Sequence, residues 1–426
     1  MLTANVYDSY IRILEEELQA ATGCTEPIAI AYCAAKLRAV LKNAPERVVA
    51  EVSGNILKNV KSVIVPNTGG RRGIPAAVAA GIVAGDADRI LQVISEIPEE
   101  KKPEIAVYEQ NTPIEVRCSD TPRLLDIRLT GWFGTDQAVV HIANNHSNIV
   151  YIEYNGCVLA EKPLQDSPED SLEDKSLLNV KDILEFAATV DLDRVSVLLE
   201  RQIAFNSAIA GEGLKGDWGA GIGRILLEER GTDIQNEAKA YAAAGSDARM
   251  SGCEMPVVIV SGSGNQGITA SLPVIRYSLH LKAGKEKLYR ALLISNLITI
   301  HQKTGIGRLS AYCGAVSAGV GSGAAIAYLK GGDYKAIAHT VVNAVAILSG
   351  TICDGAKPSC AAKIASAVDA GILGYQMYCH HKQFLDGDGI VKKGVENTIA
   401  NVGTLAREGM KQTDRTILDI MTGGAS

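Results

Sequence analysis

The sequence predicts an α+β protein, in which a smaller α+β domain with an antiparallel sheet accompanies a large, mainly helical domain rich in Ala and Gly. Three observations lead to this prediction. The chain has 426 residues, which is more than one compact core usually covers. Runs of β-branched residues separated by turn residues are concentrated between residues 47 and 153. Beyond residue 175 the pattern is mainly helical, and small residues are abundant.

The N-terminal segment, residues 1–45, predicts two helices. Over residues 4–20 the apolar side chains recur at helical spacing: Tyr7, Tyr10, Ile11, Leu14 and Leu18. After the break at Thr22-Gly23-Cys24, a second helix is expected from Thr25 to about residue 41, with Thr25 as its N-cap and Pro27 in its first turn. We expect this segment to pack on the helical domain and to present Cys24 to it.

Residues 46–170 carry the pattern of the smaller domain, with one helix expected over 74–84. Strands are expected over 48–52, 60–65, 105–108, 114–117, 125–129, 138–142 and 149–153. Turn residues between successive runs favour antiparallel pairing. The acidic segment 161–175 contains two prolines and is the expected linker. The helical domain, predicted to be catalytic, then covers residues 176–426.

Composition and charge restrict the partners and the compartment. The net charge of −6 and the absence of a basic run give no surface for nucleic acid. The first residues lack the pattern of a signal peptide, so nine cysteines indicate free thiols in the reducing cytoplasm. Residues 309–329 are long and uncharged, but their Ala, Gly and Ser content predicts a buried helix and no membrane span. Small residues on helical surfaces favour a homo-oligomer, most simply a dimer.

Three cysteines are candidate ligands of an iron–sulfur cluster. Cys353 and Cys360 lie on either side of a tight turn between two helix-like segments, and Cys313 follows a Gly-rich stretch upstream. Three thiolates at one point would hold a cluster with one open iron, which can act as a Lewis acid. The spacing leaves two alternatives. These cysteines are ordinary buried residues, or they form a zinc site, which would need a fourth Cys or His.

Cys24 is a candidate reactive thiol, because it lies directly before the helix expected from Thr25. The positive end of a helix lowers the pKa of a nearby thiol, and the thiolate can act as general base or nucleophile. The alternative is a small residue that fills a turn. We interpret the remaining cysteines as structural: Cys33, Cys118, Cys157, Cys253 and Cys379.

Two Gly-rich loops are candidate binding sites for a substrate carboxylate. One follows the apolar run that starts at Val258 and precedes an expected helix, whose first N–H groups suit an anion. The other contains an Arg that can pair with a carboxylate, and His301 and Lys303 precede Cys313. Both loops are also compatible with plain turns. The substrate-binding candidates are Ser263, Asn265, Gln266, Asn67, Thr68, Arg71 and Lys303.

Five motifs in this order resemble those of the L-cysteine desulfidase family, which is related to the α subunit of iron–sulfur L-serine dehydratases. They are Gly23-Cys-Thr-Glu-Pro27, Asn67-Thr-Gly-Gly-Arg71, Gly262-Ser-Gly-Asn-Gln-Gly267, Ala311-Tyr-Cys-Gly-Ala315 and Ile352-Cys-Asp-Gly-Ala-Lys-Pro-Ser-Cys360. The resemblance implies an oxygen-sensitive [4Fe–4S] cluster on Cys313, Cys353 and Cys360, and a catalytic thiolate at Cys24. It implies a lyase that converts L-cysteine to pyruvate, ammonia and hydrogen sulfide, with L-serine or another β-substituted amino acid as the alternative substrate.

Other functions compete with this one. The Ser-Gly-Asn loop at Ser263 resembles the carboxylate loop of some pyridoxal-phosphate lyases, but Lys215 and Lys239 lack the setting of a Schiff-base lysine. A non-catalytic, cluster-based redox sensor would usually carry a partner-binding or DNA-binding module, and none is visible. A protein that only binds an amino acid is the third possibility.

Overall fold

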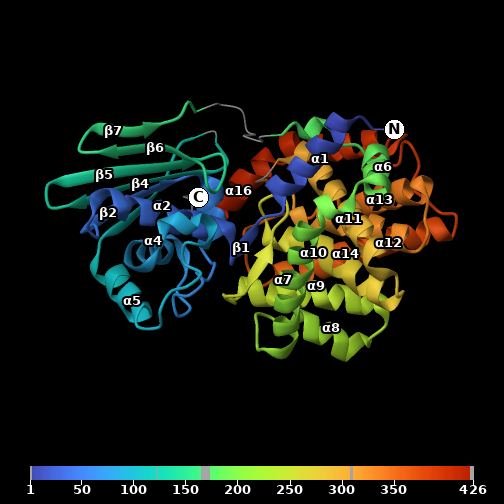
Figure 1. Ribbon diagram of the computed structural model, residues 1–426, viewed down its shortest axis with the longest axis horizontal. Coiled ribbons are helices and arrows are strands. Elements are labelled where there is room, and N and C mark those ends of the chain that lie inside the picture. Colours follow the sequence, from blue (N-terminus) through green and yellow to red (C-terminus); the bar gives the residue numbers. More distant parts are fainter. Residues whose placement is uncertain (1, 122, 165–172, 308–309, 423–426) are drawn as a thin grey trace.

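The computed structural model describes residues 2–121, 123–164, 173–307 and 310–422. Two packed regions lie side by side, one around a β-sheet and one almost entirely helical (Figure 1). Each has a hydrophobic core of its own. We call the region from α2 to β7, residues 25–161, the sheet unit. The helical unit consists of residues 4–22 together with the chain that follows residue 173. The α+β class with a large helical part is thereby confirmed.

The sheet unit contains six strands in the order β3-β2-β4-β5-β6-β7. Their bounds are Arg47–Val52 (β2), Ile114–Cys118 (β3), Asp126–Phe133 (β4), Asp136–Ala143 (β5), Ile149–Tyr154 (β6) and Cys157–Glu161 (β7). Neighbouring strands are antiparallel except β2 and β3, which are parallel. The sheet is therefore mixed, and the expectation of purely antiparallel pairing was wrong at this edge. The chain between these two strands forms helices, which supply the crossover that a parallel pair requires.

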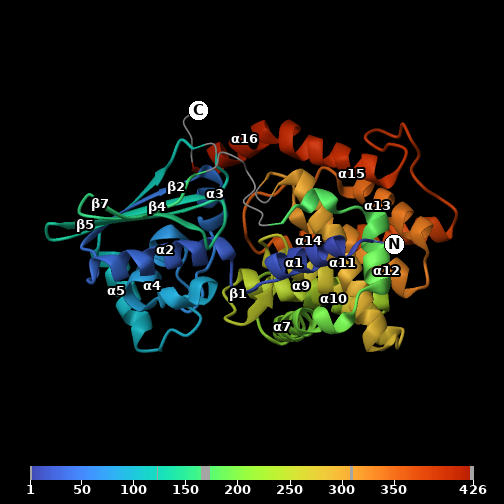
Figure 2. The same ribbon diagram turned by 45° about the horizontal axis from the view of Figure 1, so that its top comes forward.

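Helices cover one face of this sheet (Figure 2). They are α2 (Thr25–Leu41), α3 (Gly54–Val60), α4 (Gly73–Ala84) and α5 (Lys101–Asn111), with a 3-10 turn at Ala87–Gln92. Helices α2 and α4 pack backbone to backbone, because a Cβ on Gly81 would lie 2.2 Å from the carbonyl oxygen of Ala31. The small residues of both helices make this approach possible.

Two of the expected strands are not strands. Residues 60–65 contain the end of α3 and a loop, in which Ile64 forms one isolated bridge with Arg72. Residues 105–108 lie within α5, where Ile105 is buried and Val107 is 55% exposed. A run of four apolar residues is too short to show whether apolar side chains repeat with the period of a helix or of a strand.

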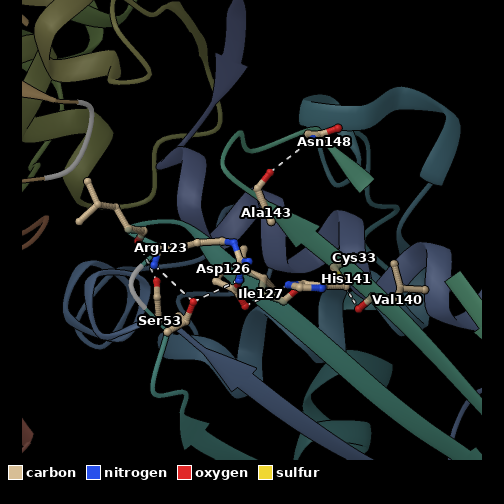
Figure 3. Close-up of polar contacts among 11 residues, drawn as sticks. Cys33, Ser53, Arg123, Asp126, Ile127, Val140, His141, Ala143 and Asn148 are labelled. Atoms are coloured by element: carbon tan, nitrogen blue, oxygen red, sulfur yellow. Dashed lines mark hydrogen bonds and ion pairs between the residues drawn. The ribbon is translucent and has the colours of Figure 1, made fainter. Parts of the chain in front are cut away.

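A polar cluster links the strands β4 and β5 in the sheet unit (Figure 3). The Nε2 of His141 lies 3.0 Å from Oδ1 of Asp126, and Arg123 donates to Oδ2 of the same carboxylate at 3.4 Å. Both partners of the His–Asp pair are buried. Beside them, the thiol of Cys33 donates to the carbonyl of Val140. The contacts of Cys33 are those of a structural residue, and burial raises its pKa far above the ordinary value.

The helical unit is built around α11, α12 and α14. Its helices are α1 (Ala4–Glu17), α6 (Val180–Thr189), α7 (Ser196–Lys215), α8 (Ile222–Arg230), α9 (Ile234–Met250), α10 (Gly264–His280), α11 (Gly284–Ile306), α12 (Gly314–Leu329), α13 (Tyr334–Leu348), α14 (Cys360–Cys379) and α15 (Val395–Thr404). A Cβ on Gly371 of α14 would lie 2.3 Å from the carbonyl oxygen of Gly319 on α12. Small residues therefore let these two helices touch through their backbones.

Helix α12 occupies most of the uncharged segment 309–329, whose first residue lies outside the described part of the chain. Nearly all of this helix is buried within the helical unit. Across the described ranges, no helix combines the length and the apolar content that crossing a bilayer requires.

The chain passes between the two units near Cys24. Helix α1 belongs to the helical core, where Tyr10 packs on Phe186 with ring centroids 5.2 Å apart. The next strand, β1 (Ala20–Thr22), pairs with β8 (Pro256–Val258). Helix α2 then lies in the other core. Residues 1–45, expected to pack together on the helical domain, are thus divided between the two cores.

The C-terminal helix α16 (Lys411–Thr422) extends from the helical unit to the sheet unit (Figure 2). There the ammonium of Lys58 on α3 forms an ion pair with Asp414, and Leu418 lies over Gly54. The helix therefore ties the two units together. Of the expected linker, residues 165–172 lie outside the described residues.

Candidate active site

A pocket between the two units collects most of the residues that the sequence singled out. Its volume is about 110 Å³, which suits a compact metabolite better than a nucleotide. The sequence-predicted residues in its lining are Cys24, Ser263, Asn265, Gln266, Lys303, Cys313, Cys353 and Cys360.

Three local structures bring the cluster candidates to this pocket. Cys313 is the N-cap of α12, and Cys360 is the first residue of α14. The loop that carries Cys353 is joined to the Cys313 segment by a short antiparallel bridge. In this bridge the N–H of Cys313 donates to Thr351 at 3.0 Å, and that of Cys353 donates to Ala311 at 2.6 Å. Two ligand candidates from distant parts of the sequence are thus held on adjacent backbone segments.

The three thiols influence one another electrostatically. The pKa of Cys313 is raised to about 12, chiefly by burial and in part by the neighbouring Cys353 and Cys360. The pKa of Cys360 is also raised, chiefly by burial and then by Cys353. Buried thiols that resist ionisation together need a nearby positive charge before they become thiolates. A metal bound by these thiols would provide that charge, because metal binding displaces thiol protons.

The donor set fits a cluster better than a single metal ion. All nine cysteines are free, so no disulfide competes for these thiols. Within the described ranges, no three His, Cys, Asp or Glu side chains are grouped closely enough to hold one ion. The ligands of a [4Fe–4S] cluster bind separate irons and stand farther apart than the ligands of one ion. Three cysteines around one pocket match that requirement.

Cys24 faces the same pocket from the N-cap position of α2. Its side chain is 1% exposed and packs with Val63, Met250 and Cys360. Burial raises its pKa to about 12, while Arg249 acts in the lowering direction and Glu26 in the raising direction. The expectation of a lowered pKa is therefore wrong for this state of the pocket. The loss of hydration on burial outweighs the favourable position at the helix end.

The N-cap and the first turn of α10 bring Ser263, Asn265 and Gln266 to the pocket. The backbone turns through positive φ at Ser261 and Gly262, and Val260 then bridges to Ser263. This tight turn places the N-terminus of α10 at the pocket, where its first N–H groups have no partners within the helix. Helix α12 packs closely against this N-terminus, because a Cβ on Gly314 would lie 2.6 Å from Cδ of Gln266.

The other Gly-rich loop does not contribute to the pocket, which corrects the prediction for Asn67, Thr68 and Arg71. Asn67 donates to the backbone oxygens of Ile94 and Ser95, and Thr68 closes its own turn by donating to Val65. Arg71 forms an ion pair with Glu109. These hydrogen bonds and this ion pair stabilise the loop and its contact with the neighbouring segments.

The two residues near the end of α11 have different surroundings. Lys303 is buried and lines the pocket, as the sequence suggested. His301 lies 2.6 Å from a carboxylate oxygen of Glu396 on α15 and is absent from the pocket lining.

Several polar residues of the lining were missed, among them Glu26, Asn59, His146 and Arg249. Glu26 lies within a motif already noted and could have been inferred from it. A lone Arg in the Ala-rich stretch of α9 was a weak signal for Arg249. Asn59 and His146 come from the sheet unit, so only the packing of the two units reveals them.

Comparison with known proteins identifies similar sequences. The family model described as serine dehydratase alpha chain matches residues 89–419. The UPF0597 protein of Desulfitobacterium hafniense is 58% identical over 420 residues, which cover 99% of this chain and 98% of the relative. The UPF0597 proteins of Treponema denticola and Lachnoclostridium phytofermentans are 46% and 49% identical, over 99% and 98% of this chain and 99% and 100% of the relatives. The matched range includes all three cluster candidates, and the full-length relatives also cover the segment of Cys24.

Proposed function

Because the chain belongs to the serine dehydratase alpha chain family, we propose that it is a lyase acting on a small β-substituted amino acid, with L-cysteine as substrate. The products would be pyruvate, ammonia and hydrogen sulfide. One observation carries the proposal: three candidate ligand thiols and a fourth thiol line one small pocket. The family description makes L-serine the second candidate, with water leaving in place of hydrogen sulfide.

Cys313, Cys353 and Cys360 would hold a [4Fe–4S] cluster, which supplies an open, Lewis-acidic iron that favours departure of the β-substituent. Sulfur is a soft donor and suits iron, which supports L-cysteine over L-serine.

Cys24 is the proposed base. Its sulfur takes the α proton, the C–H electron pair forms the Cα–Cβ double bond, and the β-substituent leaves with the electrons of its bond to Cβ. The aminoacrylate tautomerises to an imine, which water hydrolyses to pyruvate and ammonia. The thiol must first lose its own proton, and the cationic Arg249 in the same pocket favours this loss.

The pyridoxal-phosphate alternative receives no support from its candidate lysines. Lys239 forms an ion pair with Asp369 at 2.8 Å, and Lys215 lies at the end of α7. Neither residue lines the pocket.

The proposal is tested with protein that is reconstituted with iron and sulfide under anaerobic conditions. Sulfide and pyruvate are measured with L-cysteine, and pyruvate with L-serine. Cys353→Ala should lose bound iron and activity together, whereas Cys24→Ser should keep the iron and lose activity. Cys157→Ser, at an exposed position on β7, is the matched control and should change neither. If Cys24→Ser still turns over substrate, Cys24 is not the base. If pyruvate forms from L-serine alone, the substrate is L-serine and not L-cysteine.

A further inference from the structure

We infer that the pocket recognises a zwitterion, with Arg249 binding the α-carboxylate and Glu26, Asn59 and Gln266 accepting hydrogen bonds from the α-ammonium group. The inference rests on the proposed function in taking an amino acid as the ligand. It adds the residues that orient this ligand relative to Cys24.

Arg249 is a buried cation without a carboxylate partner among the described residues. It lies in the last turn of α9 and is 4% exposed. Its Nε donates to the carbonyl of Gly23 at 3.1 Å, and its Nη1 donates to Oδ1 of Asn265 at 3.2 Å. Both acceptors are neutral. A buried charge is costly unless an opposite charge accompanies it, so the guanidinium is suited to an anion that enters the pocket.

The surroundings of Arg249 strengthen the case for a carboxylate. A Cβ on Gly264 would lie 2.3 Å from Nε of Arg249, so the guanidinium packs directly on the first residue of α10. The free N–H groups at the start of this 17-residue helix favour an anion at the same place. A planar guanidinium also matches the two oxygens of a carboxylate.

Three acceptors in the same lining lack a charged donor among the residues that the structure describes. Gln266 is 4% exposed, and its Oε1 has no hydrogen-bond partner in the described part of the chain. Asn59 is also buried, and its Oδ1 has no partner there either. The Nδ2 of Asn59 donates to Glu26 at 3.0 Å and so orients that carboxylate. An ammonium group carries three N–H donors, which match these acceptors.

Cys24 is close in the chain to both charged groups. Arg249 donates to the carbonyl of the preceding residue, Gly23, and Glu26 lies in the first turn of the helix that Cys24 caps. A zwitterion that joins them would bring its α carbon, to which both charged groups are attached, to the sulfur of Cys24. The same geometry selects against ligands that lack either charge, because the unmatched group of the pocket would stay buried and unpaired.

The test measures ligand binding and does not depend on turnover. Full-length, anaerobically reconstituted protein is titrated calorimetrically with L-alanine, which carries both charges but no leaving group. L-alaninol lacks the carboxylate, and propionate lacks the ammonium. Arg249→Gln should weaken L-alanine about 10- to 100-fold, the range for a charge-assisted hydrogen bond, and leave L-alaninol unchanged. Glu26→Gln should weaken L-alanine and L-alaninol but not propionate.

Control variants separate binding from folding. Arg249→Lys keeps the charge and should recover part of the affinity, and Arg71→Gln, at the arginine already paired with Glu109, should bind as the unmodified protein does. The inference is overturned if Arg249→Gln binds L-alanine normally, or if the loss follows Lys303→Met instead. It is also overturned if the unmodified protein binds L-alaninol and propionate as tightly as L-alanine. If L-alanine binds as expected but L-cysteine yields no sulfide, the inference stands and the proposed function fails.

Discussion

The contact between α12 and α14 predicts that Gly371→Ala destabilises the helical unit and disturbs the thiol pocket. A Cβ at this position would lie 2.3 Å from the carbonyl oxygen of Gly319 and 3.2 Å from Cα of Gly323. Both neighbours are backbone atoms, so no side-chain rotation relieves the collision. Ordinary contact begins at 3.4 Å, so the helices must separate by about 1 Å (3.4 − 2.3).

Two opposing effects determine how much Gly371→Ala changes the unfolding free energy. Ala is better than Gly within a helix by about 1 kcal/mol. Overpacking a well-filled core costs about 1–3 kcal/mol, and contact with backbone on two residues puts this position at the upper end. The net loss of unfolding free energy should therefore be about 2 kcal/mol.

A matched control exists in α7. Gly211 is also within a helix, but a Cβ there would meet nothing within 4 Å. Gly211→Ala should therefore raise the unfolding free energy by about 1 kcal/mol. Denaturant unfolding, followed by far-UV circular dichroism, compares the two variants with the unmodified chain.

The separation of α12 and α14 in Gly371→Ala should also move the thiols at the ends of these helices. Cys313 is the N-cap of α12 and Cys360 is the first residue of α14, so separating the two helices changes the spacing of two ligand candidates. Iron content after anaerobic reconstitution should fall in Gly371→Ala and stay unchanged in Gly211→Ala. If the two variants are equally stable, the argument from backbone contact is wrong.

Three further predictions concern charged groups. Because burial raises the pKa of Cys24, kcat/KM should rise with pH above neutral pH as the thiolate forms, and a level profile would contradict its role as base. Burial raises the pKa of Asp247 to about 6, so the folded state holds the proton more tightly and its contribution to stability falls as pH rises from about 4 to about 6. Asp247→Asn should remove this dependence of the unfolding free energy on pH, whereas unfolding curves with an unchanged pH dependence would count against it. Asp414→Ala should cost about 3 kcal/mol, because it leaves the buried Lys58 ammonium unpaired, and the double variant with Lys58→Met should recover most of the loss; equal unfolding free energies for the single and double variants would refute this.

The thiols of the site could be predicted from the sequence because each lies next to a local signal. Cys24, Cys313 and Cys360 are at helix starts, and helix starts are visible as turn residues followed by apolar spacing. Their convergence rested on the resemblance of five motifs, since spacing alone also allowed ordinary buried cysteines.

The charged residues of the site were harder to predict. Arg71 and Arg249 are both chemically able to bind a carboxylate, and the sequence cannot tell which one is already paired. The structure shows Glu109 beside Arg71, whereas the acceptors of Arg249 within the described ranges are the neutral groups of Gly23 and Asn265. Similarly, the raised pKa of Cys24 depends on burial by Val63 and Met250, which come from opposite units. Both properties arise from the packing of segments that are distant in the sequence, so the sequence alone does not reveal them.

The division of residues 1–45 between two cores has a consequence for biosynthesis. The sheet unit is contiguous and can fold as soon as β7 has left the ribosome. Helix α1 emerges first, but its partner Phe186 follows Tyr10 by 176 residues (186 − 10). At about 5–20 residues per second, this delay is roughly 10 to 35 s. We therefore expect nascent chains to expose the apolar side of α1 while the sheet unit is already folded, which makes this helix the natural target for chaperones during translation.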